Sequence, residues 1–234
     1  MIGVLSSSIV NLIFLPPKFE SKIYYNALNI TSDIFVWFKL VLNDTSEYQN
    51  IKEDRGLIRE RLDRLEQTFS YYEEERSWTK KQAYAQNRKK ILFKEVVRST
   101  RKAYEVLKRM NRYQNDLHNL NQSLLLQIKL ELDSLITYHE QIFISLSKKA
   151  RYDARQLDSQ IENPQKKELI DAFFNDITKN PVPEDYSSAN IMQIVSSIEE
   201  YRYTLEHLDR LRISFFSYHH NDNEIDILDE DFDL

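Results

Sequence analysis

Histidine is the residue type in this chain with the widest catalytic range, because a neutral imidazole can ligate a metal or act as a general base. His139 is followed by Glu140, as in the first half of the zinc-binding motif H-E-x-x-H. That motif needs its second histidine at position 143, and the chain has Phe143 there. The histidine on the long helix around position 139 is therefore not predicted to bind zinc.

A second histidine cluster lies near the C-terminus, where His219 and His220 precede Asp222 and Glu224. These residues could bind a divalent metal weakly, but a solvated tail is the favoured interpretation. The sequence contains no glycine-rich phosphate loop, no nucleophile elbow and no catalytic triad. We therefore predict no metal site, no cofactor and no enzymatic activity.

The basic side chains could bind an anionic partner, because the net charge of −5 hides a strong segregation. Residues 78–112 contain 12 Lys or Arg against two acids, whereas residues 221–234 contain seven acids and no base. Attraction to anionic lipid would be worth about 1 kcal/mol per basic residue near the surface. The candidate contacts with lipid or a partner are Arg88, Lys89, Lys90, Lys94, Arg98, Arg101 and Lys102.

Three other interpretations of this basic run stay open. It could be a solvated helix face, or it could pair with acidic helices of the same bundle or of a second subunit. Nucleic-acid binding needs such positive charge, but the acidic segments elsewhere and the lack of a reading motif argue against it. We predict no nucleic-acid partner.

Tyrosines are frequent, with 14 in the chain. Several could line a pocket for an aromatic acid, with an Arg or Lys side chain fixing the carboxylate. The favoured interpretation is that they pack the core with their hydroxyl groups at its edge. The tyrosines considered are Tyr24, Tyr25, Tyr71, Tyr72, Tyr104, Tyr138, Tyr201 and Tyr203.

The composition predicts helices as the elements that position these groups. Charged residues make up 29% of the chain, and it has only two glycines and five prolines, too few for the tight turns of a β-rich fold. The chain has no cysteine, so disulfides and thiolate metal sites are excluded. We predict an all-α fold, an elongated antiparallel helical bundle of about four long helices plus shorter ones.

Hydrophobic spacing of three, four and seven residues predicts where these helices lie. Residues 21–42 form an apolar, aromatic-rich helix, either in the core of the bundle or, less favoured, at a membrane surface. A second helix is expected from Ser46 to about residue 75, including Gly56, and a turn or kink follows between residues 76 and 86. The next helix then continues to Arg112 and is followed by a turn at residues 117–120. The remaining helices are expected over residues 123–160, over 164–178 and from Ser187 or Ser188 onward.

The N-terminal residues predict a membrane-spanning helix and the point where the chain leaves the membrane. Residues 1–15 are uncharged and mostly apolar, and Pro16 and Pro17 end any helix there. Lys18 and Lys22 follow, as on the cytoplasmic side of a spanning helix. About 15 residues fall short of the roughly 20 that cross a bilayer, so we expect the chain to begin inside a membrane helix. The alternatives are an N-terminal core helix of a soluble bundle and a signal peptide.

The exit pattern N-[apolar]-F-x-P-P-K-[aromatic]-E, carried by Asn11, Phe14, Pro16, Pro17, Lys18 and Glu20, resembles the bacterial aromatic acid exporter family of the fusaric-acid-resistance type. Within that family it is most similar to the Gram-positive branch. Weaker matches follow in residues 71–76, 88–112 and 135–141, so the resemblance covers most of residues 1–145. The family's membrane helices are absent here apart from the last part of one, so no transport activity is assigned to this chain alone.

Together these features predict a membrane segment at 1–17, a juxtamembrane or amphipathic helix at 18–45, a cytoplasmic bundle at 46–220 and a disordered acidic tail at 221–234. The resemblance implies a non-enzymatic domain that assembles or regulates a cell-membrane protein from the cytoplasmic side. Its expected partners are membrane lipid at the N-terminus and either a second copy or a transporter membrane domain. The alternatives are a soluble helical interaction module and an aromatic-carboxylate sensing domain.

Overall fold

The computed structural model describes residues 19–43, 48–75, 80–147, 168–179, 187–217 and Ile225. Within these residues every regular element is a helix, which confirms the predicted all-α class. None of the described helices combines the length and the apolar character that a bilayer crossing requires. The predicted membrane segment at 1–17 lies outside the described residues.

The described helices follow the predicted order closely. They are α2 (Phe19–Leu42), α3 (Tyr48–Glu74), α4 (Lys80–Arg112), α5 (Gln114–His118), α6 (Gln122–Leu146), α8 (Glu168–Lys179) and α9 (Ser188–Ser217). Five of them are 24 to 33 residues long, where about four long helices were predicted. The additional long helix is α2, which packs as a full member of the bundle.

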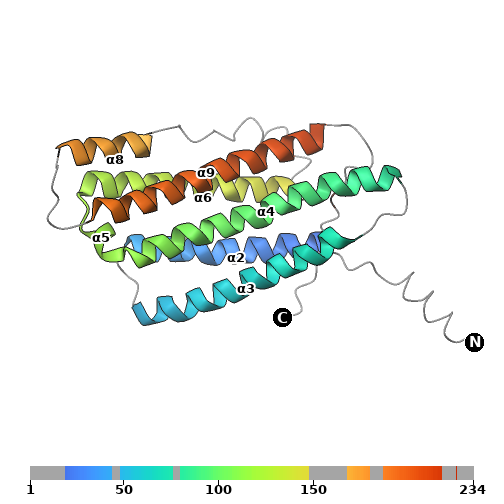
Figure 1. The fold of residues 1–234 in the computed structure, drawn as a ribbon, viewed down its shortest axis with the longest axis horizontal. Helices are drawn as coiled ribbons and strands as arrows, with labels where there is room; N and C mark the ends of the chain where they lie inside the picture. The colour runs from blue at the N-terminus through green and yellow to red at the C-terminus, as the bar shows by residue number, and fades with distance from the viewer. Residues whose placement is uncertain are drawn as a thin grey trace, which may run out of the picture.

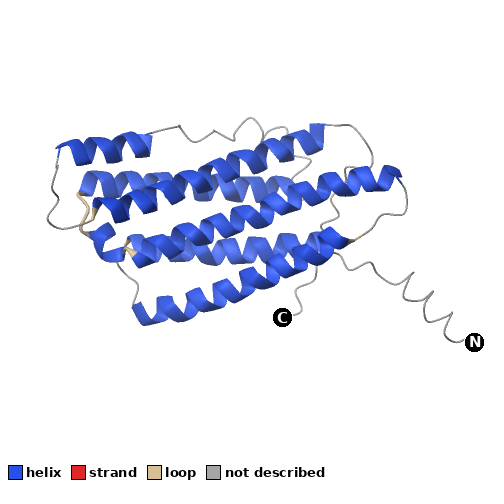
Figure 2. Ribbon diagram, viewed as in Figure 1, coloured by secondary structure: helices blue, strands red, loops and turns tan. Residues whose placement is uncertain are grey.

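The long helices lie side by side in an elongated bundle (Figures 1 and 2). Helices that follow one another in the chain are antiparallel, as predicted. Two pairs of helices that are not neighbours in the chain, α2 with α4 and α6 with α9, also pack together and are parallel (Figure 1). Between α2 and α4, the contacts Glu20–Lys89 and Thr31–Thr100 both join residues 69 apart, so the two helices share one register.

Helix α3 shows how the sequence builds the bundle. Its buried side chains are Ile58, Leu62, Leu65, Phe69 and Tyr72, which alternate steps of four and three residues. This heptad spacing places them in one seam along the helix, and the seam packs against α2 and α4. Most polar residues between them face solvent, whereas half-buried Arg61 and Glu66 bond Asp33 of α2 and Arg101 of α4.

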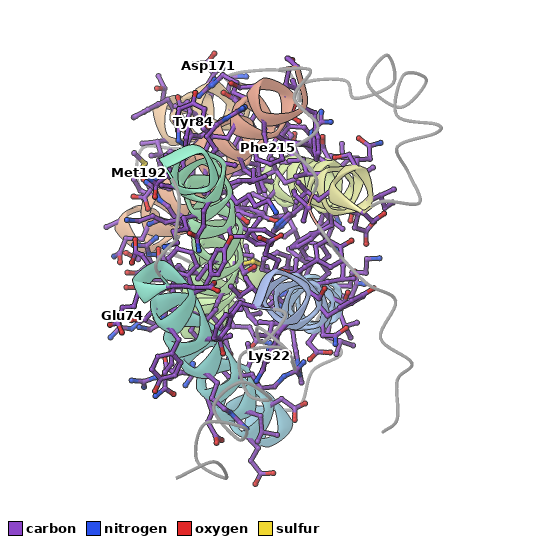
Figure 3. The ribbon with its side chains drawn as sticks, turned by 90° about the vertical axis from the view of Figure 1, so that its right-hand side faces the viewer. Lys22, Glu74, Tyr84, Asp171, Met192 and Phe215 are labelled. Carbon is purple, nitrogen blue, oxygen red and sulfur yellow. The ribbon has the colours of Figure 1, made fainter. Side chains whose placement is uncertain are left out.

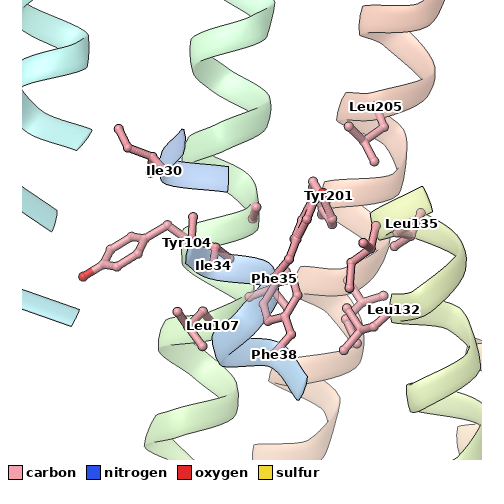
Figure 4. Close-up of a cluster of buried hydrophobic side chains, with 14 of the residues drawn as sticks. Ile30, Ile34, Phe35, Phe38, Tyr104, Leu107, Leu132, Leu135, Tyr201 and Leu205 are labelled. Carbon is pink, nitrogen blue, oxygen red and sulfur yellow. The ribbon is translucent and has the colours of Figure 1, made fainter. Parts of the chain in front are cut away.

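The centre of the core joins four helices (Figure 4). Side chains of α2 (Ile34, Phe38), α4 (Leu107), α6 (Leu132) and α9 (Tyr201, Leu205) all belong to the core cluster of the described residues. Burying each large apolar side chain contributes about 1.5–3 kcal/mol. The burial of α2 along its length supports the core interpretation of residues 21–42 over an interfacial helix.

One residue of the predicted acidic tail is described. Ile225 is fully buried and belongs to the hydrophobic core cluster. The prediction of disorder over the rest of residues 221–234 stays a prediction, because those residues lie outside the described ones.

Candidate functional site

Three consecutive basic residues near the start of α4 each contact a different helix end. We call Arg88, Lys89 and Lys90 the clasp. Their hydrogen bonds place them where α2 begins, α3 ends and α9 ends. Figure 3 views this end of the bundle. Adjacent residues on a helix point in directions about 100° apart, which lets three neighbours reach three different helices.

The middle residue of the clasp fixes the first turn of α2. The Lys89 ammonium lies 3.2 Å from the Glu20 carboxylate, and the Tyr72 hydroxyl donates to the same carboxylate at 3.0 Å. The Lys89 and Glu20 side chains are each 18% exposed. Burial and the neighbouring Glu20 charge raise the pKa of Tyr72 far above its usual value, so the hydroxyl stays a donor.

The other two clasp residues cap helix C-termini. Lys90 donates to the carbonyl oxygens of Glu73 at 2.8 Å and Glu75 at 2.6 Å, where α3 ends. Arg88 donates to the carbonyl oxygens of Ser214 at 2.9 Å and Phe215 at 3.2 Å, and its guanidinium lies 5.2 Å from the centre of the Phe215 ring. A cation here satisfies carbonyl groups that the helix leaves unpaired and complements the helix dipole.

The remaining predicted contact residues also have partners within the chain. Arg101 donates to Glu66 at 2.7 and 2.5 Å and to Asp63 at 3.2 Å, joining α4 to α3. Lys102 bridges Glu105 at 2.8 Å and Glu200 at 3.0 Å, joining α4 to α9. Each exposed pair contributes about 1 kcal/mol or less.

The two candidate residues not yet described, Lys94 and Arg98, have exposed side chains and also form ion pairs. Lys94 lies 3.8 Å from Glu73, and Arg98 lies 3.3 Å from Glu95 on its own helix. All seven basic residues thus take part in hydrogen bonds or ion pairs inside the chain, five of them with acidic side chains and Arg88 and Lys90 with backbone carbonyl oxygens. Their contact with lipid or a partner protein remains a prediction.

The structure describes one residue of the predicted membrane-exit pattern, Glu20, which contacts Lys89 and Tyr72. The other five, Asn11, Phe14, Pro16, Pro17 and Lys18, lie outside the described residues. His219, His220, Asp222 and Glu224 lie outside them too. Within the described ranges no group of three or more His, Asp or Glu side chains could hold a metal ion.

The predicted tyrosines do not form one pocket. Tyr24 donates to the Phe143 carbonyl oxygen at 2.9 Å, and burial raises the pKa of Tyr24 to about 12. Tyr138 donates to Asp209 at 3.1 Å in the contact between α6 and α9. Both are buried, as are Tyr72, Tyr104 and Tyr201, whereas Tyr71 and Tyr203 are exposed. Most therefore pack the core, as the favoured interpretation states.

A buried polar network crosses the middle of the bundle. Ser99 of α4, His139 of α6 and Tyr201 of α9 are each fully buried, with His139 Nε2 3.1 Å from Ser99 Oγ and Nδ1 2.7 Å from the Tyr201 hydroxyl. Ser99 also donates to the Val96 carbonyl oxygen at 2.8 Å. Since a hydroxyl has one proton to donate, His139 Nε2 donates to Ser99 and Nδ1 accepts from Tyr201.

This network has the residue types of a nucleophile and a base, but its position does not suit catalysis. All three side chains are 0% exposed, so solvent and substrate do not reach them. Burial lowers the pKa of His139 to about 3, which keeps the imidazole neutral. The network instead links α4, α6 and α9 by hydrogen bonds that only one packing arrangement satisfies.

Buried charges between α6 and α9 were missed in the sequence. Arg202, only 1% exposed, forms ion pairs with Glu131 and with Glu199, the latter at 3.4 Å. One heptad further along both helices, Asp209 accepts from Tyr138. The pairs 131–202 and 138–209 keep the same offset, so α6 and α9 are parallel. The available sequence signal for the burial of Arg202 was its position next to Tyr201 within the apolar pattern of the last helix.

A shallow depression lies on the outer face of α4 and α9. It is lined by Arg98 and Lys102 of α4 and by Tyr203, Thr204 and His207 of α9, and it also includes Glu95 and Glu200. Tyr203 is 57% exposed. Here two of the seven predicted basic residues and one predicted tyrosine lie together.

Comparison with known proteins finds one protein of similar sequence. The chain is similar to the UPF0421 protein YgaE of Bacillus subtilis (strain 168), with 35% identity over 227 residues, covering 97% of this chain and 63% of that protein. The chain thus spans less than two thirds of its relative's length. No family model matches the chain, and no solved structure matches it.

Proposed function

We propose that this chain is a non-enzymatic helical domain of a cell-membrane protein, held to the bilayer through its N-terminal segment. The bundle lies on the cytoplasmic side and assembles or regulates that protein. We also propose that it belongs with UPF0421 proteins and that these share the architecture of the aromatic acid exporter family.

The observation that carries this proposal is the fixed point where the chain enters the bundle. Glu20 is the last residue of the membrane-exit pattern, and Lys89 and Tyr72 both hold it. If residues 1–17 insert in a membrane, they continue directly into the first turn of α2, which is bonded to α3 and α4 through Glu20. Such a connection would hold the bundle close beneath the bilayer. Such a bundle would hold attached or bound domains in a fixed place relative to the membrane and would not catalyse a reaction.

The similarity to a longer protein is the second support. The aligned region covers 63% of YgaE, so in that protein an equivalent bundle would be joined to further chain. A domain that works beside other segments needs rigid internal contacts and an accessible surface. The proposed partners are lipid at the N-terminus and either a second copy or a transporter membrane domain.

Membrane fractionation tests this proposal. The full chain is compared with a version that starts at Lys18, which keeps Glu20 and all described helices. The proposal predicts that the full chain pellets with membranes and that the shorter chain is soluble with an unchanged helical circular dichroism spectrum. If both are soluble and equally folded, the chain is a soluble interaction module instead.

A second candidate function is the sensing of aromatic carboxylates, favoured by the depression between α4 and α9. A carboxylate can pair with the Arg98 guanidinium, of which one nitrogen bonds Glu95, and a ring can pack on Tyr203. Benzoate should then raise the melting temperature of the chain but not of Arg98→Ala. Arg64→Ala, which removes an exposed arginine of α3, is the control. Equal shifts for both variants, or none for the unaltered chain, would exclude this function.

A further inference from the structure

Five helix termini lie toward one end of the bundle, where the first turns of α4 extend beyond the start of α2. Helices α2 and α4 begin there, and α3, α6 and α9 end there (Figure 1). The opposite end carries α5 and α8, and Asn121 at the start of α6 bonds Asp176 of α8 there. The two ends are far apart, since the 33 residues of α4 span about 50 Å at 1.5 Å per residue.

The chain enters α2 at the first of these ends, and its direction is fixed there. The Phe19 and Tyr72 rings lie 6.2 Å apart, and Glu20 is held between Tyr72 and Lys89. These contacts tie the first turn of α2 to α3 and α4. The uncharged, mostly apolar residues 1–15 are therefore connected to this end and not to the other.

Three helices present an exposed tyrosine or lysine close to this end. Lys22 lies in the first turn of α2, Tyr71 in the last turn of α3 and Tyr84 in the second turn of α4. Tyr84 is 68% exposed and Tyr71 is 54% exposed. Tyrosine and lysine suit a bilayer surface, because each has an apolar body and a polar tip.

Among the side chains that the structure describes, the charges at this end are mixed. Exposed Glu73 and Glu74 end α3, and Glu73 lies 3.8 Å from exposed Lys94. Exposed Lys22 lies on α2, and Figure 3 labels it together with Glu74. The clasp residues already pair with Glu20 and with backbone carbonyl oxygens. A bilayer at this end would therefore be contacted through tyrosine rings and lysine stems, with little dependence on lipid charge.

We infer that the end of the bundle carrying Lys22, Tyr71 and Tyr84 lies against the lipid headgroups, and that the α5–α8 end points away from the membrane. This inference rests on the membrane anchor proposed above and adds the orientation of the bundle to it. The long axes of the helices are then roughly perpendicular to the bilayer surface rather than parallel to it. The clasp holds the helix ends together, and the basic run of α4 is not a lipid-binding face.

The absence of native cysteine allows a direct test. Single cysteines are introduced into the full chain as Tyr84→Cys and Lys22→Cys at the near end and as Asp171→Cys on α8. All three positions are exposed, and circular dichroism checks that each labelled variant is folded. Each carries a fluorescent donor and is mixed with phosphatidylcholine vesicles whose headgroups bear an acceptor.

Energy transfer from positions 84 and 22 should exceed that from position 171 by at least about twofold, since a helix of the length of α4 separates the ends by about 50 Å. Adding phosphatidylserine to the vesicles should change this ratio little. Equal transfer from the three positions would mean that the bundle lies along the membrane, and stronger transfer from position 171 would mean that it is inverted. Either result overturns the inference. Failure of the chain to float with vesicles would instead refute the membrane anchor itself.

Discussion

Replacing His139 with glutamine should make the stability of the bundle less dependent on pH. The imidazole is fully buried between Ser99 and Tyr201 and stacks on the Phe143 ring, with the ring centres 4.8 Å apart. Both of its hydrogen-bond partners are neutral hydroxyl groups, so nothing in the network compensates a positive charge. The folded protein therefore keeps His139 neutral, whereas the unfolded chain can protonate it.

The size of the effect follows from the two pKa values. Burial lowers the pKa of His139 from 6.5 to about 3. Between these values the unfolded chain binds a proton that the folded chain does not, so the free energy of unfolding falls as the pH falls. The slope approaches 1.4 kcal/mol per pH unit but is only half of that near pH 6.5, so the loss from about pH 6.5 to about pH 4.5 should be about 2 kcal/mol.

Urea unfolding followed by circular dichroism measures this effect across the pH range. His139→Gln should be less stable than the unaltered chain near neutral pH by about 1–3 kcal/mol, because the amide replaces the imidazole hydrogen bonds imperfectly. The two stabilities should converge toward pH 4.5, since the variant lacks the proton-linked loss. His207→Gln, an exposed change on α9, is the control and should follow the unaltered chain. If His139→Gln loses stability with pH as steeply as the unaltered chain, the assignment of a neutral buried histidine is wrong.

Three further substitutions test other contacts. Gly56→Ala should raise the free energy of unfolding by about 1 kcal/mol, because an added Cβ meets nothing within 4 Å and alanine favours the helix; thermal melting would show no gain if α3 were strained there. Arg202→Met should cost about 3–5 kcal/mol by leaving buried carboxylates uncompensated, and adding Glu131→Leu should recover part of it; additive losses in urea unfolding would contradict the ion pair. Lys90→Met should cost about 1 kcal/mol and increase hydrogen exchange in the last turn of α3, whose carbonyl groups lose their cap; unchanged exchange there would show that the cap is not needed.

Most helix positions could be predicted because they depend on local patterns. The seam of Ile58, Leu62, Leu65, Phe69 and Tyr72 follows from spacing alone, and the structure places it in α3. Helix α4 begins at Lys80, within the range where a turn was expected, and α9 begins at the predicted Ser188. A short helix, Gln114–His118, was not foreseen, because five residues carry too little periodicity.

The long-range contacts could not be predicted in the same way. The basic run was visible in the sequence, but the three separate helix ends that Arg88, Lys89 and Lys90 contact depend on how helices far apart in the chain pack. The parallel registers of α2 with α4 and of α6 with α9 depend on the same packing. His139 occupies a core position in the apolar pattern of α6, and that was the available signal for its burial.

The most direct test of the central claim changes the N-terminal segment without shortening the chain. Leu12→Asp and Ile13→Asp together should prevent insertion into lipid, because an acidic side chain in the hydrocarbon region costs roughly 3 kcal/mol. We predict that the unaltered chain stays with membranes after an alkaline carbonate wash and that the double variant is found in the soluble fraction with its helices intact. If the double variant is retained as firmly as the unaltered chain, residues 1–17 do not anchor the bundle and the proposed membrane role is wrong.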